Sequence, residues 1–80
     1  MAELSTKEIR PRAQSALAAS PIYELRDLLV EQAGESLLIS GRVTSFYHKQ
    51  LAQEIVRTVV GSVQVVNSIQ VDQEDLLANS

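Results

Sequence analysis

His48 is the residue in this sequence best suited to acid–base or metal chemistry, because it is the only histidine in a chain without cysteine. A nucleophilic or metal site needs several such groups held together. No such set accompanies His48, which would lie in the first turn of a helix. We therefore interpret His48 as a surface or half-buried side chain. We predict no catalytic residue, metal ligand or cofactor, and we do not expect an enzyme.

Asp27 and Glu31 are a second candidate, as a pair of acidic side chains near each other in the sequence. Two catalytic carboxylates need a separation of ~5–10 Å and a cleft that raises the pKa of one of them. A small domain has little room for such a cleft. We interpret both residues as solvated charges on a strand.

Bases and aromatic side chains coincide in one segment, residues 42–49. Its candidate lipid-binding residues are Arg42, Phe46, Tyr47 and Lys49. Aromatic rings flanked by cations suit a membrane interface, where each basic residue contributes about 1 kcal/mol at an anionic surface. The alternative is that Phe46 covers the core and the charges are merely solvated.

Asn67 lies among aliphatic residues at alternate positions of an expected strand, with Val65, Ile69 and Val71 on the same face. An unsatisfied buried amide would cost about 1–3 kcal/mol. We expect the Asn67 side chain to bond to backbone, for example in the loop before the second helix. Its role is then structural.

The chain of 80 residues is long enough for one domain with a marginal core, which would bury about 60% of the unfolded surface. Aromatic residues are few, so the core must be aliphatic. The net charge of −3 disfavours nucleic acid as a partner. The glycines also lack the GXXG spacing of an RNA-binding KH domain.

The N-terminal sequence MAELSTKEIR has no apolar segment of the kind that signal peptides contain. No apolar run approaches the ~20 residues of a membrane-spanning helix. We expect a cytoplasmic location if the chain is complete. If it was cut from a longer protein, a periplasmic or membrane-associated location is expected instead.

The first half of the chain predicts a helix followed by a strand. Ser5 and Glu8 have capping-box spacing, which would start a helix early, but Pro11 conflicts with a helix running through it. We favour a helix over about 10–19, with Pro11 in its first turn. Residues 25–32 are predicted as a strand, although their leucines also have helical spacing.

The second half predicts strand, helix and strand at residues 37–43, 45–60 and 63–71. Gly34 marks a hairpin turn before the first of these strands. Gly41 weakens a strand unless another segment packs closely over it, and a crossing helix backbone would explain it. Gly61 is expected to end the second helix with a left-handed conformation.

These elements predict an α+β domain of order αββαβ, with a small three-stranded mixed sheet and two helices packed on one face. The first two strands form an antiparallel hairpin, and the second and third run parallel through a right-handed crossover. We place the domain at residues 10–71. Residues 1–9 are expected to be a flexible N-terminus and 72–80 a polar tail.

The order and motifs resemble the BON domain family (bacterial OsmY and nodulation). Its pattern is an Ala-Leu pair, a strand, a glycine turn, V-x-L-x-G-x-V, a helix with an alanine, and G-V-x-x-V-x-N-x-L-x-V. The matching residues, within about 13–71, are Ala16, Leu17, Gly34, Leu37, Ile39, Gly41, Val43, Ala52, Gly61, Val65, Asn67, Ile69 and Val71. Two departures are Ser62 in place of an apolar residue and a turn, Gly34-Glu35-Ser36, one residue longer than the common Asp-Gly turn.

The resemblance implies an αββαβ fold and a non-enzymatic module that binds phospholipid or attaches proteins to membranes. An anionic phospholipid surface is the first expected partner. The alternative is a protein–protein interaction module without lipid binding, which uses an edge strand or forms a homo-oligomer. Salt separates the two, since lipid binding through a few cations should weaken at moderate salt.

Overall fold

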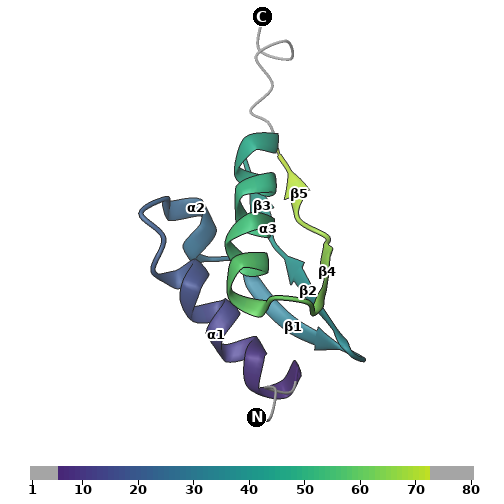
Figure 1. The fold of residues 1–80 in the computed structure, drawn as a ribbon. Coiled ribbons are helices and arrows are strands. Elements are labelled where there is room, and N and C mark those ends of the chain that lie inside the picture. Colours follow the sequence, from purple (N-terminus) through teal and green to yellow (C-terminus); the bar gives the residue numbers. More distant parts are fainter. Residues whose placement is uncertain (1–5, 73–80) are drawn as a thin grey trace, which may run out of the picture.

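The computed structural model describes residues 6–72 of the chain and contains three helices and five short strands. The helices lie on one side and the strands on the other, as Figure 1 shows. The elements, in order, are α1 (Thr6–Ala18), α2 (Tyr23–Arg26), β1 (Leu29–Ala33), β2 (Ser36–Ser40), β3 (Arg42–Val43), α3 (Phe46–Val60), β4 (Gln64–Asn67) and β5 (Gln70–Val71).

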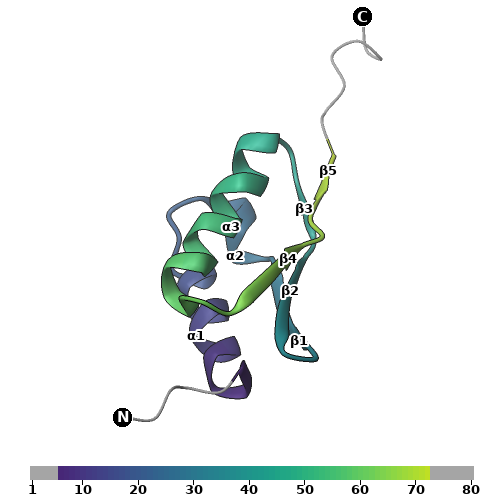
Figure 2. The ribbon, with the colours of Figure 1, turned by 45° about the vertical axis from the view of Figure 1, so that its right-hand side comes forward.

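The main sheet has the strand order β1-β2-β4, so β2 is the central strand. β1 and β2 are antiparallel, and β2 and β4 are parallel across the α3 crossover. The helices cover one face of this sheet, and Figure 2 shows the sheet nearly edge-on with the helices to one side. The predicted α+β class and mixed three-stranded sheet are confirmed.

β3 follows β2 and β5 follows β4, each after a short break, and β3 and β5 continue the parallel pairing of β2 with β4. Ile39 is paired with Asn67 before the break and Arg42 with Gln70 after it, so the register is the same on both sides. The Ser68 N–H donates to the Ile39 carbonyl across the gap. The predicted strands 37–43 and 63–71 are therefore each one extended segment with a kink.

The first helix is longer than predicted, because it begins at Thr6 and contains Pro11. The expectation of a helix from about Arg10 is wrong. Ile9, Ala13 and Leu17 are spaced four residues apart on one face and are all buried. Burial of Ile9, before the proline, helps to offset the hydrogen bond that Pro11 cannot make. Residues 1–5 and 73–80 lie outside the described part of the chain, and the proposed domain limits stay a prediction.

The predicted strand over 25–32 is half wrong, since its first residues form the short helix α2 and β1 starts only at Leu29. Leu25 and Leu28 are three residues apart, which in a helical turn places them on one face, and both are buried. Their N–H groups bond to carbonyls three residues back, at Ile22 and Leu25. Packing of these leucines therefore overrides the alternating pattern that favoured a strand.

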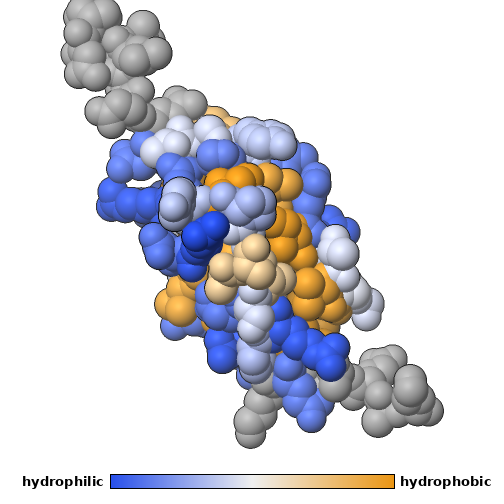
Figure 3. Space-filling model, turned by 90° about the vertical axis from the view of Figure 1, so that its left-hand side faces the viewer, coloured by the Kyte–Doolittle hydropathy of each residue, from blue (hydrophilic) through white to orange (hydrophobic). Residues whose placement is uncertain are grey.

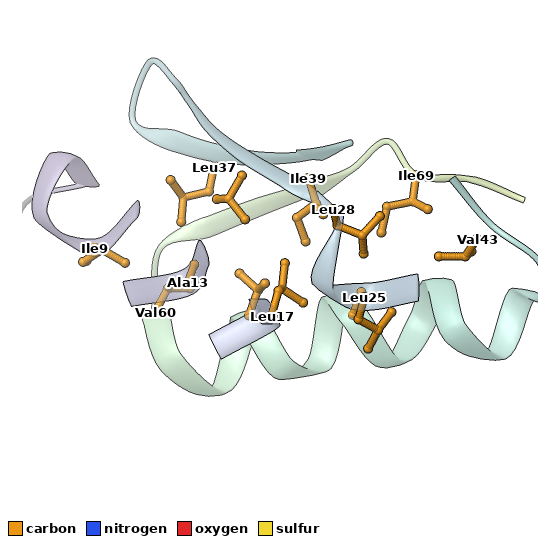
Figure 4. Packing of buried hydrophobic residues seen from close by; sticks show 13 residues of the cluster. Ile9, Ala13, Leu17, Leu25, Leu28, Leu37, Ile39, Val43, Val60 and Ile69 are labelled. Atoms are coloured by element: carbon orange, nitrogen blue, oxygen red, sulfur yellow. The ribbon is translucent and has the colours of Figure 1, made fainter. Parts of the chain in front are cut away.

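The core is aliphatic, as predicted, and lies between the sheet and the two long helices (Figure 4). It contains no aromatic residue among its buried members. They are Ile9, Ala13, Leu17, Leu25, Leu28, Val30, Leu37, Ile39, Val43, Ala52, Val56, Val60 and Ile69. Some apolar surface remains on the helical side, where Figure 3 shows an apolar strip among hydrophilic side chains.

Three glycines have positive φ, and two of them fix how the chain turns. Gly34 and Glu35 form a two-residue hairpin turn, with Ala33 paired to Ser36. A glycine at the first central position is typical of a type II′ turn. The turn is thus shorter than the three-residue turn expected from the sequence, because Ser36 already belongs to β2. Gly61 ends α3, as predicted, and its N–H donates to the Arg57 carbonyl. Its φ of 67° is positive, but its ψ of −119° lies outside the left-handed helical region, so the predicted left-handed conformation is wrong.

Candidate functional site

All three aromatic side chains of the chain are exposed, and the buried core consists of aliphatic side chains. Tyr23 is 78% exposed, Phe46 63% and Tyr47 68%. Phe46 and Tyr47 begin α3, and Tyr23 begins α2. We call these three residues the aromatic end. Phe is usually buried and Tyr is intermediate, so the exposure of all three rings in one small domain is a feature that a function could explain.

The start of α3 is fixed by its cap. Ser45 has an extended backbone, with φ −148° and ψ 152°, and its hydroxyl accepts a hydrogen bond from the His48 N–H at 3.1 Å. This cap satisfies one of the free N–H groups that begin a helix. It also holds Phe46 and Tyr47 in the first helical turn, while the buried side chains of α3 come from its later turns, at Ala52, Val56 and Val60.

Glu24 joins α2 to the start of α3. Its carboxylate accepts hydrogen bonds from the Thr44 N–H at 3.0 Å and the Thr44 hydroxyl at 2.6 Å, and it lies 2.8 Å from Nδ1 of His48. The Thr44 hydroxyl, then the Thr44 N–H and then His48 lower the pKa of Glu24 to about 2. Glu24 is therefore ionised near neutral pH, and it ties α2, which begins with Tyr23, to the segment that carries Phe46 and Tyr47.

His48 is half-buried, in agreement with its interpretation from the sequence. It serves as the partner of Glu24, and its ring centroid lies 5.8 Å from that of Tyr47. Asp27 and Glu31 are both exposed. In residues 6–72, no group of three His, Cys, Asp or Glu side chains is placed to hold a metal ion.

The cations around the aromatic end are not equally available. The Arg42 guanidinium lies 3.3 Å from the Asp72 carboxylate, and both side chains are largely exposed. Lys49 is half-buried. Arg26 donates from Nε to the Ser20 carbonyl at 2.7 Å, and its Cζ lies 4.6 Å from the centre of the Tyr23 ring, an arrangement typical of a cation–π contact.

Tyr23 and Arg26 were missed as candidate residues by the reasoning from sequence. The segment after Tyr23 was interpreted as a strand, so nothing connected it to residues 42–49. The helical spacing of Leu25 and Leu28 was the signal that could have placed them. Because α2 leaves Tyr23 and Arg26 exposed, we add them to the candidate residues Arg42, Phe46, Tyr47 and Lys49.

The three residues predicted to be structural lie away from this surface or beneath it. The Asn67 amide donates to the Lys49 carbonyl and to Oε1 of Gln53, both at 3.0 Å, and its oxygen accepts from the Ile69 N–H at 3.1 Å. Its backbone partners are thus the first turns of α3 and its own strand rather than the preceding loop. Gly61 ends α3, as described above.

Gly41 sits at the break between β2 and β3, with φ +133°. A Cβ at this position would lie 2.7 Å from Cδ2 of Leu28 and 3.5 Å from its Cα. The close neighbour is the buried Leu28 of the segment before β1, and the expectation of a crossing helix backbone is wrong.

Comparison with protein families matches the BON domain over residues 5–73, which is most of the chain. The protein belongs to the BON family. Comparison with curated proteins and with solved structures gave no match. The family resemblance noted from the sequence is thereby confirmed.

The motif residues of this BON domain form its inner layer. Leu37, Ile39 and Val43 are buried along the glycine-containing strand. On the last strand Ile69 is buried, and Val65, Asn67 and Val71 are half-buried on the same face. The motif therefore specifies the core, and the aromatic end lies outside it. In the described part of the chain, no helix combines the length and the apolar character needed to cross a bilayer.

Proposed function

We propose that this BON domain is a non-catalytic module that associates peripherally with phospholipid surfaces through its aromatic end. The observation that carries the proposal is the exposure of Tyr23, Phe46 and Tyr47 in a domain whose core is entirely aliphatic. Rings of this kind are enriched at membrane interfaces, where an apolar body and a polar tip both find a suitable environment. The family is also regarded as one of phospholipid-binding modules.

Electrostatics gives this surface a preference for anionic lipid that is weak and dependent on salt. Lys49 and Arg26 would each contribute about 1 kcal/mol near an anionic bilayer, whereas Asp72 already compensates the charge of Arg42. The whole chain carries a net charge of −3, so an anionic surface repels the rest of the molecule. Insertion of the rings must therefore supply much of the binding free energy.

Co-sedimentation with vesicles tests the proposal. We expect the purified chain to sediment with anionic vesicles at low salt, less at ~0.15 M salt, where the Debye length is about 8 Å, and least with neutral vesicles. The double variant Phe46→Ser/Lys49→Glu should lose binding, since it removes one ring and reverses one charge of the proposed surface.

A matched control variant tests whether the loss of binding is specific to the proposed surface. Leu29→Ser/Arg57→Glu removes a partly exposed apolar side chain and reverses a charge elsewhere, with the same change in net charge. It should bind like the original chain. Equal binding by both double variants, or no binding to any vesicle, would contradict the proposal.

A further inference from the structure

The two outer strands of the main sheet, β1 and β4, differ in whether another segment covers their outer edge. On β1, the side chain of Gln14 in α1 pairs with the strand as another strand would. Its Oε1 accepts from the Val30 N–H at 2.9 Å, and its Nε2 donates to the Leu28 carbonyl at 2.7 Å. Arg10 donates to the Val30 carbonyl at 3.1 Å. Helix α1 thus covers the β1 edge.

The β4 edge has no such cover among the described residues. Ser68 and Gln70 direct their N–H groups toward the β2–β3 side, to Ile39 and Gly41. Alternate residues of a strand point their backbone groups to opposite sides, so those of Val65 and Asn67 point outward. In this outward row, the Ile69 N–H donates to Oδ1 of the Asn67 side chain at 3.1 Å.

The edge strand itself also lacks the charges that usually keep exposed strands apart, although one cation, Arg57 of α3, lines a hollow with Gln64 and Val65. Residues 61–71 contain no Asp, Glu, Lys, Arg or His and no proline. Charged side chains, proline and covering helices are the common means by which proteins prevent edge-to-edge pairing. A strand without charged side chains can lie against a second copy of itself without repulsion between like charges on the two strands, and a two-fold symmetric interface needs such a self-complementary surface.

We propose that two copies of this domain pair antiparallel through their β4 strands. Only residues whose backbone groups point outward can form the hydrogen bonds between the two strands. We therefore choose the register in which the outward groups of both Val65 and Asn67 are paired at the centre. In it, Val65 of each copy is hydrogen-bonded opposite Asn67 of the other, and Val66 faces Val66 across the two-fold axis. The two three-stranded sheets would then form one continuous sheet.

The outer face of the sheet supports a second copy as the occupant rather than an arbitrary strand. Leu38 is paired with Val66 in the sheet, and Val66 is 41% exposed. The proposed register places the four side chains in the row Leu38, Val66, Val66, Leu38 across the joined sheets. Contacts between facing aliphatic side chains are the usual source of stability between strands.

The interface is small, with about four backbone hydrogen bonds across the axis. Small interfaces form weak complexes, so we expect a dissociation constant on the order of 100 µM. Sedimentation equilibrium up to ~1 mM protein covers this range. Val66→Lys should weaken association at least about tenfold, because it places two like charges against each other.

Leu29→Lys is the matched control, since Leu29 is an apolar residue of the opposite edge strand that is 48% exposed. It should leave association unchanged. A chain that stays monomeric over the whole range would overturn the proposal. So would a dimer that Val66→Lys weakens no more than Leu29→Lys does.

A single cysteine tests the register, because the chain has none of its own. Facing residues of a non-hydrogen-bonded antiparallel pair have Cα atoms about 4.5 Å apart, within the range of a disulfide. Val66→Cys should therefore give a disulfide-linked dimer under mild oxidation, while Gln64→Cys and Leu29→Cys should cross-link far less. Equal cross-linking of all three variants would overturn the proposed register.

Discussion

Substitution of Gly41 by valine is expected to destabilise the domain by more than about 2 kcal/mol, which lowers its melting temperature by at least ~8 °C for a domain of this size. Two effects add. The φ of +133° is strained for any residue with a Cβ, and that Cβ would lie 2.7 Å from Cδ2 of Leu28. Leu28 is 2% exposed and surrounded by core, so it cannot move aside freely.

Thermal unfolding followed by circular dichroism measures this effect, and Gly34→Ala separates its two causes. Gly34 also has positive φ, at +63°, but a Cβ there would meet nothing within 4 Å. Its substitution should cost only the backbone strain, about 1–2 kcal/mol. If Gly41→Val melts within ~2 °C of the original chain, the close packing of Leu28 over Gly41 does not limit stability.

Asn67→Ala should destabilise the domain by about 2–3 kcal/mol, the second largest effect we expect. The substitution leaves the N–H of the buried Ile69 without its acceptor and removes the bond of the Asn67 amide to the Lys49 carbonyl. These contacts tie the end of β4 to the first turns of α3. Their loss should therefore also loosen the turn that presents the aromatic end.

Urea denaturation gives the free energy of unfolding for this variant, with Gln70→Ala as the control. Gln70 is an exposed amide on the neighbouring strand β5, and its truncation should cost no more than about 0.5 kcal/mol. Equal losses for the two variants would mean that the Asn67 hydrogen bonds contribute little net stability.

The elements with a strong and unopposed pattern were predicted well from the sequence. Helix α3 has a serine cap, an apolar face of helical period and a terminal glycine, and it runs from Phe46 to Val60, within a residue of the predicted 45–60. The alternation of Val65, Asn67, Ile69 and Val71 likewise placed the inner face of the last strand. In both cases local preference and core packing favour the same structure.

The sequence misled where local pattern and tertiary packing disagree. Pro11 argued for a short first helix, but burial of Ile9 extends it to Thr6. The spacing of the leucines in residues 25–32 fitted both a strand and a helix. The burial of Leu25 and Leu28 favours the helical turn, which is α2. The contacts of Glu24 with Thr44 and His48 join segments about twenty residues apart, which no local pattern predicts.

The same limit applies to the candidate site. Phe46 and Tyr47 could be singled out because they adjoin basic residues, but the alternative that Phe46 covers the core was open until its exposure was known. Tyr23 becomes a candidate only because α2 forms and leaves its ring exposed. The asymmetry of the two sheet edges depends on Gln14 and Arg10, whose reach from α1 to β1 follows from packing.

The measurement that tests the membrane proposal most directly is the fluorescence of Phe46→Trp with vesicles, since the chain has no tryptophan of its own. We predict that its emission shifts to shorter wavelength when anionic vesicles are added, because the indole leaves water for the interface. Leu29→Trp, which places the reporter on the sheet's outer face, should not shift. An unchanged spectrum for Phe46→Trp, or an equal shift for both variants, would contradict binding through the aromatic end.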